Sequence, residues 1–125
     1  IAKGGKVVAV LDRGIRNADD RELYEELTNN HLVLSIYPNQ VVSRNTETEI
    51  ATNSLIATLS TSLLIGGITD KSPISTAVAF GLSQGADIYC IPFPIGNHYM
   101  NNQLIKDGAM LVENGNDILI RKENF

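Results

Sequence analysis

Short runs of apolar residues alternate along the chain with longer segments in which apolar residues recur every three or four positions. The runs are rich in β-branched residues, as in 6–11 (KVVAVL), and are typical of strands buried on both faces of a parallel sheet. The segments between them have helical spacing, for example Ala51, Leu55 and Leu59. The predicted strands are 6–11, 31–37, 63–65, 87–91 and 110–112. The predicted helices lie between Asn17 and Asn30, over 47–59, between Ser72 and Gly85, and over 102–107 and 116–120.

Polar residues mark the expected starts of the first two helices. Asn17 is a predicted N-cap, and Asp19 and Asp20 fall in the first turn, where the helix dipole favours acidic side chains. Thr46 and Glu49 have the spacing of a capping box. These signals support helices between the first and second and between the second and third strands.

The order of elements predicts an α/β, Rossmann-like fold. Five strand and helix pairs in alternation favour a mostly parallel sheet of about five strands, with helices on both faces, as part of a larger sheet. Ligands of such sheets bind at the carboxyl edge of the strands. The loops 12–17, 38–45, 66–72 and 92–98 should gather there, so the sequence predicts the functional site in these four loops.

Composition and charge further restrict the class of protein that the sequence can encode. The chain has 125 residues, 43% of them hydrophobic, and a formal charge of −4, with a pI of about 5.0. This predicts one folded domain over 1–125 with no membrane-spanning segment, and it argues against a strong sequence-independent phosphate binder. A single cysteine, Cys90, cannot form an internal disulfide, which predicts a cytoplasmic protein. Because the chain begins at Ile1, it is expected to be a piece of something longer.

Few residues carry candidate chemistry. Asp12-Arg13-Gly14 follows the first strand as a βα turn, without a full glycine-rich phosphate motif. Ser72-Pro73 starts a helix beside Lys71, and its free backbone N–H groups would suit a phosphate. Cys90 is expected to be a small buried hydrophobe, and His31 and His98 to be surface residues. No nucleophile, base and orienting group share a catalytic spacing, so the sequence predicts no enzyme, no metal and no cofactor.

Seven blocks in order resemble the DNA-processing protein family DprA, also called Smf, over nearly the whole chain. They read GGKVVAVL, DRELYEEL, HLVLSIYP, NSLIATLS, SPISTA, DIYCIPFPI and NNQLIKDGAMLVEN. The resemblance implies the C-terminal portion of a single Rossmann-like domain of this family. It also implies single-stranded DNA binding, natural transformation, loading of a RecA-type recombinase, and a homodimer formed through the C-terminal part of the domain.

The chain departs from the family pattern at the expected DNA pocket. Asp12-Arg13-Gly14 replaces a glycine-threonine-glycine turn and places a carboxylate near the expected phosphates. The family's Arg-Arg-Asn-Arg becomes Ala51-Thr52-Asn53-Ser54, so only Asn53 is kept. Each lost phosphate contact weakens binding and flattens its salt dependence. The predicted nucleic-acid-binding residues that remain are Lys6, Arg13, Gly14, Arg44, Asn53, Lys71, Ser72, Thr76 and Asn102.

Two alternatives belong to other functional classes. Gly66-Gly67-Ile68-Thr69 is similar to the phosphate loop of the LOG-like phosphoribohydrolases, which hydrolyse nucleoside monophosphates. The catalytic glutamate of that family would fall at Ser72, so this enzyme ranks below DNA binding. The other alternative is a paralogue that only dimerises or docks a partner, which the loss of arginines favours.

Overall fold

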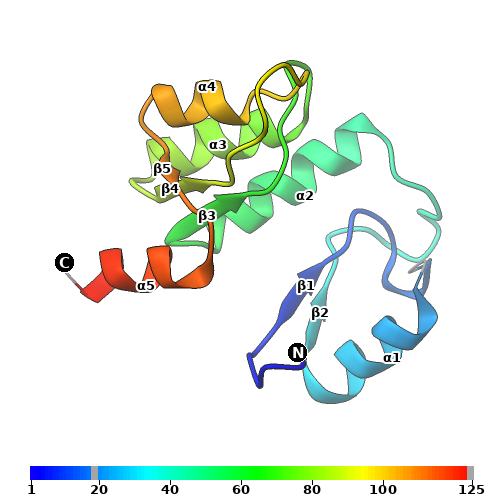
Figure 1. Cartoon of the computed structure of the whole chain (residues 1–125). Helices are drawn as coiled ribbons and strands as arrows, with labels where there is room; N and C mark the ends of the chain where they lie inside the picture. The colour runs from blue at the N-terminus through cyan, green and yellow to red at the C-terminus, as the bar shows by residue number, and fades with distance from the viewer. Residues whose placement is uncertain (18–19, 124–125) are drawn as a thin grey trace. The chain divides into compact units, whose positions relative to one another are not determined.

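Five parallel strands and five α-helices follow one another along the chain, and a computed structural model describes them over residues 1–17 and 20–123. The first half contains β1 (Val8–Val10), the 3-10 helix η1 (Ile15–Asn17), α1 (Arg21–Asn30), β2 (Leu32–Leu34) and α2 (Thr46–Thr58). The second half contains β3 (Ser62–Ile65), α3 (Ile74–Ser83), β4 (Asp87–Cys90), α4 (Asn101–Lys106), β5 (Met110–Leu111) and α5 (Gly115–Glu123). The predicted α/β class with parallel strands is confirmed (Figure 1). None of the described helices is long and apolar enough to span a membrane.

The strands form two sheets, and the chain divides into two compact units, 1–52 and 53–125. In the first unit β1 pairs with β2, with Val8 opposite Leu32. In the second unit the strand order is β3-β4-β5. The expectation of one sheet of about five strands is corrected to sheets of two and three strands. The assignment of 1–125 to a single domain stays a prediction.

The strands of the first unit are shorter than predicted. Leu11 N–H still donates to the carbonyl of Leu34, but the chain leaves the ladder at Ser35. There the Ser35 hydroxyl donates to the carbonyl of Arg13 at 2.6 Å and accepts the N–H of Tyr37 at 3.0 Å. A side chain that bonds the neighbouring backbone competes with strand pairing in this way. β2 therefore ends at Leu34 instead of residue 37.

The first two helices are capped by residues other than the predicted ones. Asp20 caps α1, and its carboxylate accepts the N–H of Leu23 at 3.0 Å, so the prediction of Asn17 as N-cap is wrong. Asp19 lies outside the described residues. At α2, Asn45 Oδ1 accepts the N–H of Thr48 and Thr48 Oγ1 accepts the N–H of Asn45. This reciprocal pair replaces the predicted capping box, because an asparagine one residue earlier offers a better side-chain acceptor.

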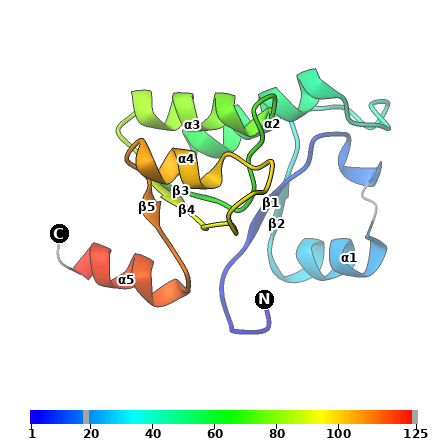
Figure 2. The same ribbon diagram turned by 45° about the horizontal axis from the view of Figure 1, so that its top comes forward.

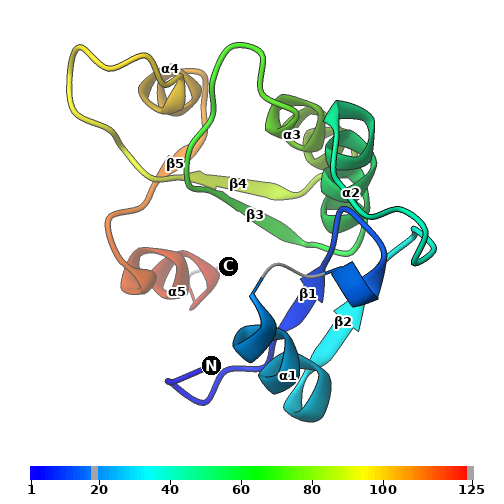
Figure 3. The same ribbon diagram turned by 90° about the vertical axis from the view of Figure 1, so that its right-hand side faces the viewer.

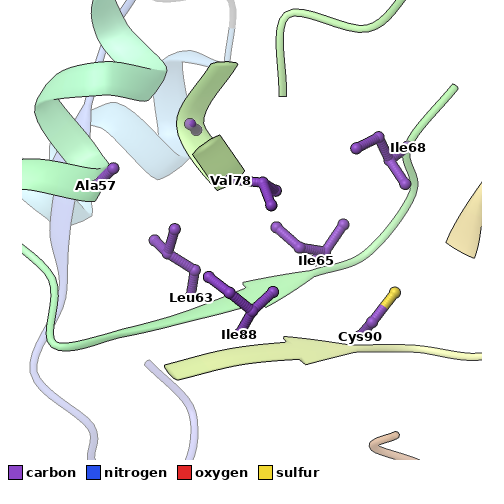
Figure 4. Packing of buried hydrophobic residues seen from close by; sticks show 8 residues of the cluster. Ala57, Leu63, Ile65, Ile68, Val78, Ile88 and Cys90 are labelled. Carbon is purple, nitrogen blue, oxygen red and sulfur yellow. The ribbon is translucent and has the colours of Figure 1, made fainter. Parts of the chain in front are cut away.

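Helices cover both faces of the three-stranded sheet. Figures 1 and 2 show α3 and α4 together on one face, and Figure 3 shows α5 on the opposite one. Alternate residues of β3 and β4 point toward α3, which is the period-two pattern of strands. The buried cluster consists of Ala57, Leu63, Ile65, Ile68, Ala77, Val78, Ile88 and Cys90 (Figure 4). This core fixes the carboxyl ends of β3 and β4, from which two of the predicted functional loops leave.

Candidate nucleic-acid interface

The loops after β1 and β2 leave the same edge of the first sheet because the two strands are parallel. Asp12 and Arg13 directly follow β1, and Arg44 lies on the long loop after β2. The N–H of Gly14, which is buried, donates to the carbonyl of Val41 at 2.9 Å and ties the two loops together. The structure thus brings together three of the predicted site residues, Arg13, Gly14 and Arg44.

The charges at this edge compensate one another. The Asp12 carboxylate lies 3.2 Å from Arg13 Nε and 3.9 Å from Arg44 Nη1. Arg44 Nε in turn lies 3.6 Å from Glu49 Oε1. The Arg13 side chain is 13% exposed and that of Arg44 is 62% exposed, so Arg44 is the more accessible cation. Two acids against two arginines leave little net positive potential for a phosphate.

Lys6, a predicted site residue, lies away from these loop ends. Lys6 is exposed and precedes the amino end of β1, whereas Arg13 follows its carboxyl end. A strand rise of about 3.3 Å per residue separates the two by about 20 Å. Asn53 is half-buried in the interior of α2. The structure does not bring Lys6 to the edge that holds the arginines.

The start of α3 differs from the expected anion site. Lys71 is exposed, as a phosphate ligand would need, and so is Thr76. The N–H groups from Ser72 to Thr76 are already used: Ser72 N donates to Thr69 O, Ile74 N to Ser72 Oγ, Ser75 N to Ser72 O and Thr76 N to Pro73 O. The expectation of free N–H groups near Ser72 and Thr76 is therefore wrong. The turn before the helix satisfies them locally, as capping groups commonly do.

Asn101, at the start of α4, joins the loops after β3 and β4. It is fully buried. Its Oδ1 accepts the N–H of Ile68 at 3.0 Å, and its Nδ2 donates to the carbonyls of Gly66 at 3.1 Å and Ile91 at 2.9 Å. The N–H of Met100 adds a bond to Ile68 O at 2.7 Å. One amide thereby fixes the carboxyl edge of the second sheet.

The neighbouring Asn102, a predicted DNA ligand, holds the loop after β4. Its Oδ1 accepts the N–H of Phe93 at 3.0 Å and its Nδ2 donates to the carbonyl of Phe93 at 2.7 Å. One of the two amide hydrogens is therefore already engaged. In the structure the Asn102 amide, on α4, positions Phe93. Its assignment as a DNA ligand stays a prediction.

An aromatic cluster on this loop was not predicted from the sequence. The ring centroids of Phe93 and Tyr99 are 4.5 Å apart at an interplanar angle of 63°, and those of His98 and Tyr99 are 4.4 Å apart at 33°. His98 is exposed, as predicted, but it stacks on a neighbour. The signal available in the sequence was three rings within seven residues of a loop after a buried strand.

Two further residues with candidate chemistry are Cys90 and His31. Cys90 is fully buried, and burial raises the pKa of its thiol, while its hydrogen bond to Asn101 acts in the opposite direction. A protonated buried thiol fits the predicted packing role. The prediction for His31 is wrong in part, because this residue is half-buried and its Nδ1 accepts the N–H of Val7 at 3.3 Å. Among residues 1–17 and 20–123, no group of three or more His, Cys, Asp or Glu is placed to hold a metal ion.

Parallel strands joined by crossover helices, with polar loops at the carboxyl edges, define a Rossmann-like α/β protein with a candidate nucleic-acid interface. The family model of DNA recombination-mediator protein A matches residues 1–123. The chain belongs to this family, and the predicted resemblance is confirmed.

Solved structures of DNA processing protein A are similar to the chain. DNA processing protein A (DprA) from Streptococcus pneumoniae has 27% sequence identity and a TM-score of 0.83, over 95% of this chain and 44% of that one. DNA processing protein A from Helicobacter pylori, described for its single-stranded DNA binding mode, has 16% identity and a TM-score of 0.72, over 93% of this chain and 56% of that one. The chain thus spans about half the length of these proteins. No curated protein sequence matches it significantly.

Proposed function

We propose that this chain binds single-stranded DNA and takes part in DNA processing, including natural transformation and the loading of a RecA-type recombinase. The observation that carries the proposal is the family match over residues 1–123. The similar Helicobacter pylori protein is one described as binding single-stranded DNA. In this chain the proposed contacts come from the loops at the carboxyl edges of the strands, chiefly Arg13 and Arg44 in the first unit and Lys71 in the second.

The charges around the proposed contacts imply that single-stranded DNA binds weakly and that its affinity depends only slightly on salt concentration. Asp12 and Glu49 neutralise the two arginines, and Lys71 follows Asp70 directly in the sequence. For single strands, the slope of log K against log salt is about −0.7 for each phosphate neutralised. We expect a slope of about −1.4 to −2.1, which is the signature of only two or three phosphate contacts.

Fluorescence anisotropy with a labelled oligothymidine at several salt concentrations tests the proposal. We expect binding at low salt that weakens with the slope given above. The absence of any binding at low salt would refute the proposal and favour a paralogue that only docks a protein partner.

Asp12→Asn directly tests the contribution of Arg13 and Arg44 at the carboxyl edge of the first sheet. The neutral amide removes one negative charge from beside Arg13 and Arg44, while Arg44 keeps its contact with Glu49. The affinity for oligothymidine should therefore rise by up to about tenfold, and the salt slope should steepen by about 0.7. Glu22→Gln on α1 makes the same change of charge on an exposed helix and serves as the matched control. If the two variants gain the same affinity, the change in net charge explains the gain, and Arg13 and Arg44 are not specifically responsible.

We infer that the chain has no hydrolase activity. Gly66-Gly67-Ile68-Thr69 lies after β3 as a phosphate loop would, but the Gly66 carbonyl and the Ile68 N–H are both bonded to Asn101. Ser72 stands where the hydrolase glutamate would be, and its hydroxyl accepts the N–H of Ile74. Incubation with AMP should release no free base. Turnover that Asp70→Ala abolishes would reverse this inference.

We also infer a homodimer through the C-terminal part of the chain. Exposed apolar side chains gather there, on β5 and α5: Leu111, Leu119 and Ile120. Burial of such residues between two copies removes apolar surface from water. Sedimentation equilibrium at micromolar concentration should give twice the chain mass, and Leu119→Glu should return the monomer. A monomeric wild-type chain would refute the dimer.

A further inference from the structure

The three rings of the loop after β4 take no part in the phosphate contacts proposed above. Phe93 is half-buried, Tyr99 is 38% exposed and His98 is exposed. The rings contact one another edge-on and tilted, at centroid distances of 4.5 and 4.4 Å. They belong to no part of the buried cluster of the second unit, which lies between the sheet and α3. The rings therefore form a partly exposed aromatic surface at the carboxyl edge, where ligands of this fold class bind.

Hydrogen bonds hold the rings in place before any ligand arrives. Asn102 bonds both the N–H and the carbonyl of Phe93. Asn97 Oδ1 accepts the N–H of Tyr99 at 2.7 Å, and Asn97 Nδ2 donates to the carbonyl of Pro94. A loop fixed in this way loses little conformational freedom on binding, so more of the contact energy appears as affinity.

The rings of Tyr99 and Phe93 lie close to Gly67, on the loop after β3. A Cβ built at Gly67 would lie 3.4 Å from Tyr99 Cε1 and 3.7 Å from Phe93 Cζ. The ring pair thus packs on the neighbouring loop instead of extending into solvent. The platform combines the loops after two adjacent strands, which is the arrangement of a binding surface at a sheet edge.

The charges of these two loops indicate what the rings would bind. Over 66–73 and 91–100 the ionised side chains are Asp70 and Lys71, which compensate each other. An uncompensated basic patch, which would favour the phosphate backbone, is missing from these stretches. Aromatic side chains bind single-stranded nucleic acid by stacking on its bases, and every base offers a π-face.

We propose that Phe93, His98 and Tyr99 form a base-stacking platform for single-stranded DNA, with His98 and Tyr99 offering the accessible rings. This inference rests on the proposed function and adds its chemical basis: the bases, more than the phosphates, supply the affinity at the second sheet. It accounts for how a chain with compensated arginines could still bind single strands.

The test compares two probes of equal length and charge, an oligothymidine and an abasic oligodeoxyribose phosphate, by anisotropy with the full chain. We expect the oligothymidine to bind the wild type more tightly, and Tyr99→Ala to weaken its binding by about 5- to 150-fold per stacked base. Tyr99→Phe keeps a ring and should retain wild-type affinity. Binding of the abasic probe should change little in any variant.

Phe80→Ala is the matched control, since Phe80 is a 41% exposed ring on α3 of the same unit. Thermal unfolding followed by circular dichroism shows whether each variant is folded, and His98→Ala replaces Tyr99→Ala if the latter is not. Equal binding of both probes by the wild type, or equal losses in Phe80→Ala and Tyr99→Ala, would overturn the platform and leave DNA binding intact. Failure of both probes to bind would overturn the platform together with the proposed function.

Discussion

Replacement of Asn101 by alanine should strongly destabilise the second unit. The side chain is fully buried and makes three hydrogen bonds, with Gly66, Ile68 and Ile91, at 2.9 to 3.1 Å. Each bond contributes about 1 kcal/mol net, and a buried group left without a partner costs about 1–3 kcal/mol. Some of that cost is recovered if water enters the space. We therefore expect Asn101→Ala to lower the free energy of unfolding by about 3–5 kcal/mol.

Urea unfolding followed by circular dichroism measures this loss. With an m-value of about 1.5 kcal/mol/M, the midpoint should fall by about 2–3 M. Asn116→Ala, at an exposed position of α5, is the control and should leave the midpoint nearly unchanged. A loss below about 1 kcal/mol for Asn101→Ala would refute the reasoning, because it would mean that the loops satisfy their backbone groups without the amide.

Asn101→Asp separates the hydrogen bonds from side-chain volume. The carboxylate can still accept the N–H of Ile68, but it faces the carbonyl oxygens of Gly66 and Ile91 without a hydrogen to donate. Protonation restores one donor, so the acid is favoured in its neutral form and its pKa should rise. The folded variant should thus lose stability as pH rises from about 4.5 to about 7. An equal loss at both pH values would argue against bonding to these carbonyls.

Two further predictions concern the core of the second unit. Gly81→Ala should lower stability by about 1–2 kcal/mol even though alanine favours a helix, because its Cβ would lie 2.6 Å from Leu63 Cδ1. Urea unfolding measures this loss of stability. The double variant with Leu63→Val should recover most of it. Gly115→Ala is the control, because no atom lies within 4 Å of a Cβ built at Gly115. Burial raises the pKa of the Cys90 thiol, so folding favours the neutral form. The stability that this contributes is complete below the ordinary thiol pKa of about 8.5 and is lost as pH rises through the pKa of the folded state. The free energy of unfolding, measured at about pH 7 and about pH 9.5, should show this decline in the wild type and not in Cys90→Ala.

The order of elements and their parallel pairing followed from the sequence alone. Continuous β-branched runs such as 6–11 predicted strands, and connections of a dozen or more residues force parallel crossovers. The prediction that 6–11 is buried on both faces is wrong, because Val8 on β1 is 54% exposed. Family membership could also be predicted from the sequence, because seven short blocks that resemble the family occur in the same order along the chain. The burial of Cys90 followed in the same way from its place inside an apolar strand.

The details of the candidate site depended on contacts between residues distant in sequence. Asp12 and Arg44 are neighbours only because β1 and β2 end at the same edge. The role of Asn101 required the loops after β3 and β4 to meet around one side chain, and the sequence shows only an asparagine before a helix. Hydrogen bonds from side chains to nearby backbone groups decided where elements begin and end. The Ser35 hydroxyl ends β2, and Asp20 and Asn45 cap the helices in place of Asn17 and Thr46.

The sequence by itself determined which segments of this protein form strands and helices, since hydrophobic periodicity is a local property that tertiary packing here preserves. Only the tertiary structure decided which polar groups remain available to a ligand. The N–H groups at the start of α3 are bonded within the chain, two arginines are paired with acids, and the rings of His98 and Tyr99 stay accessible. The availability of a hydrogen-bond donor or a charge depends on its partners in space, and a sequence pattern does not specify those partners.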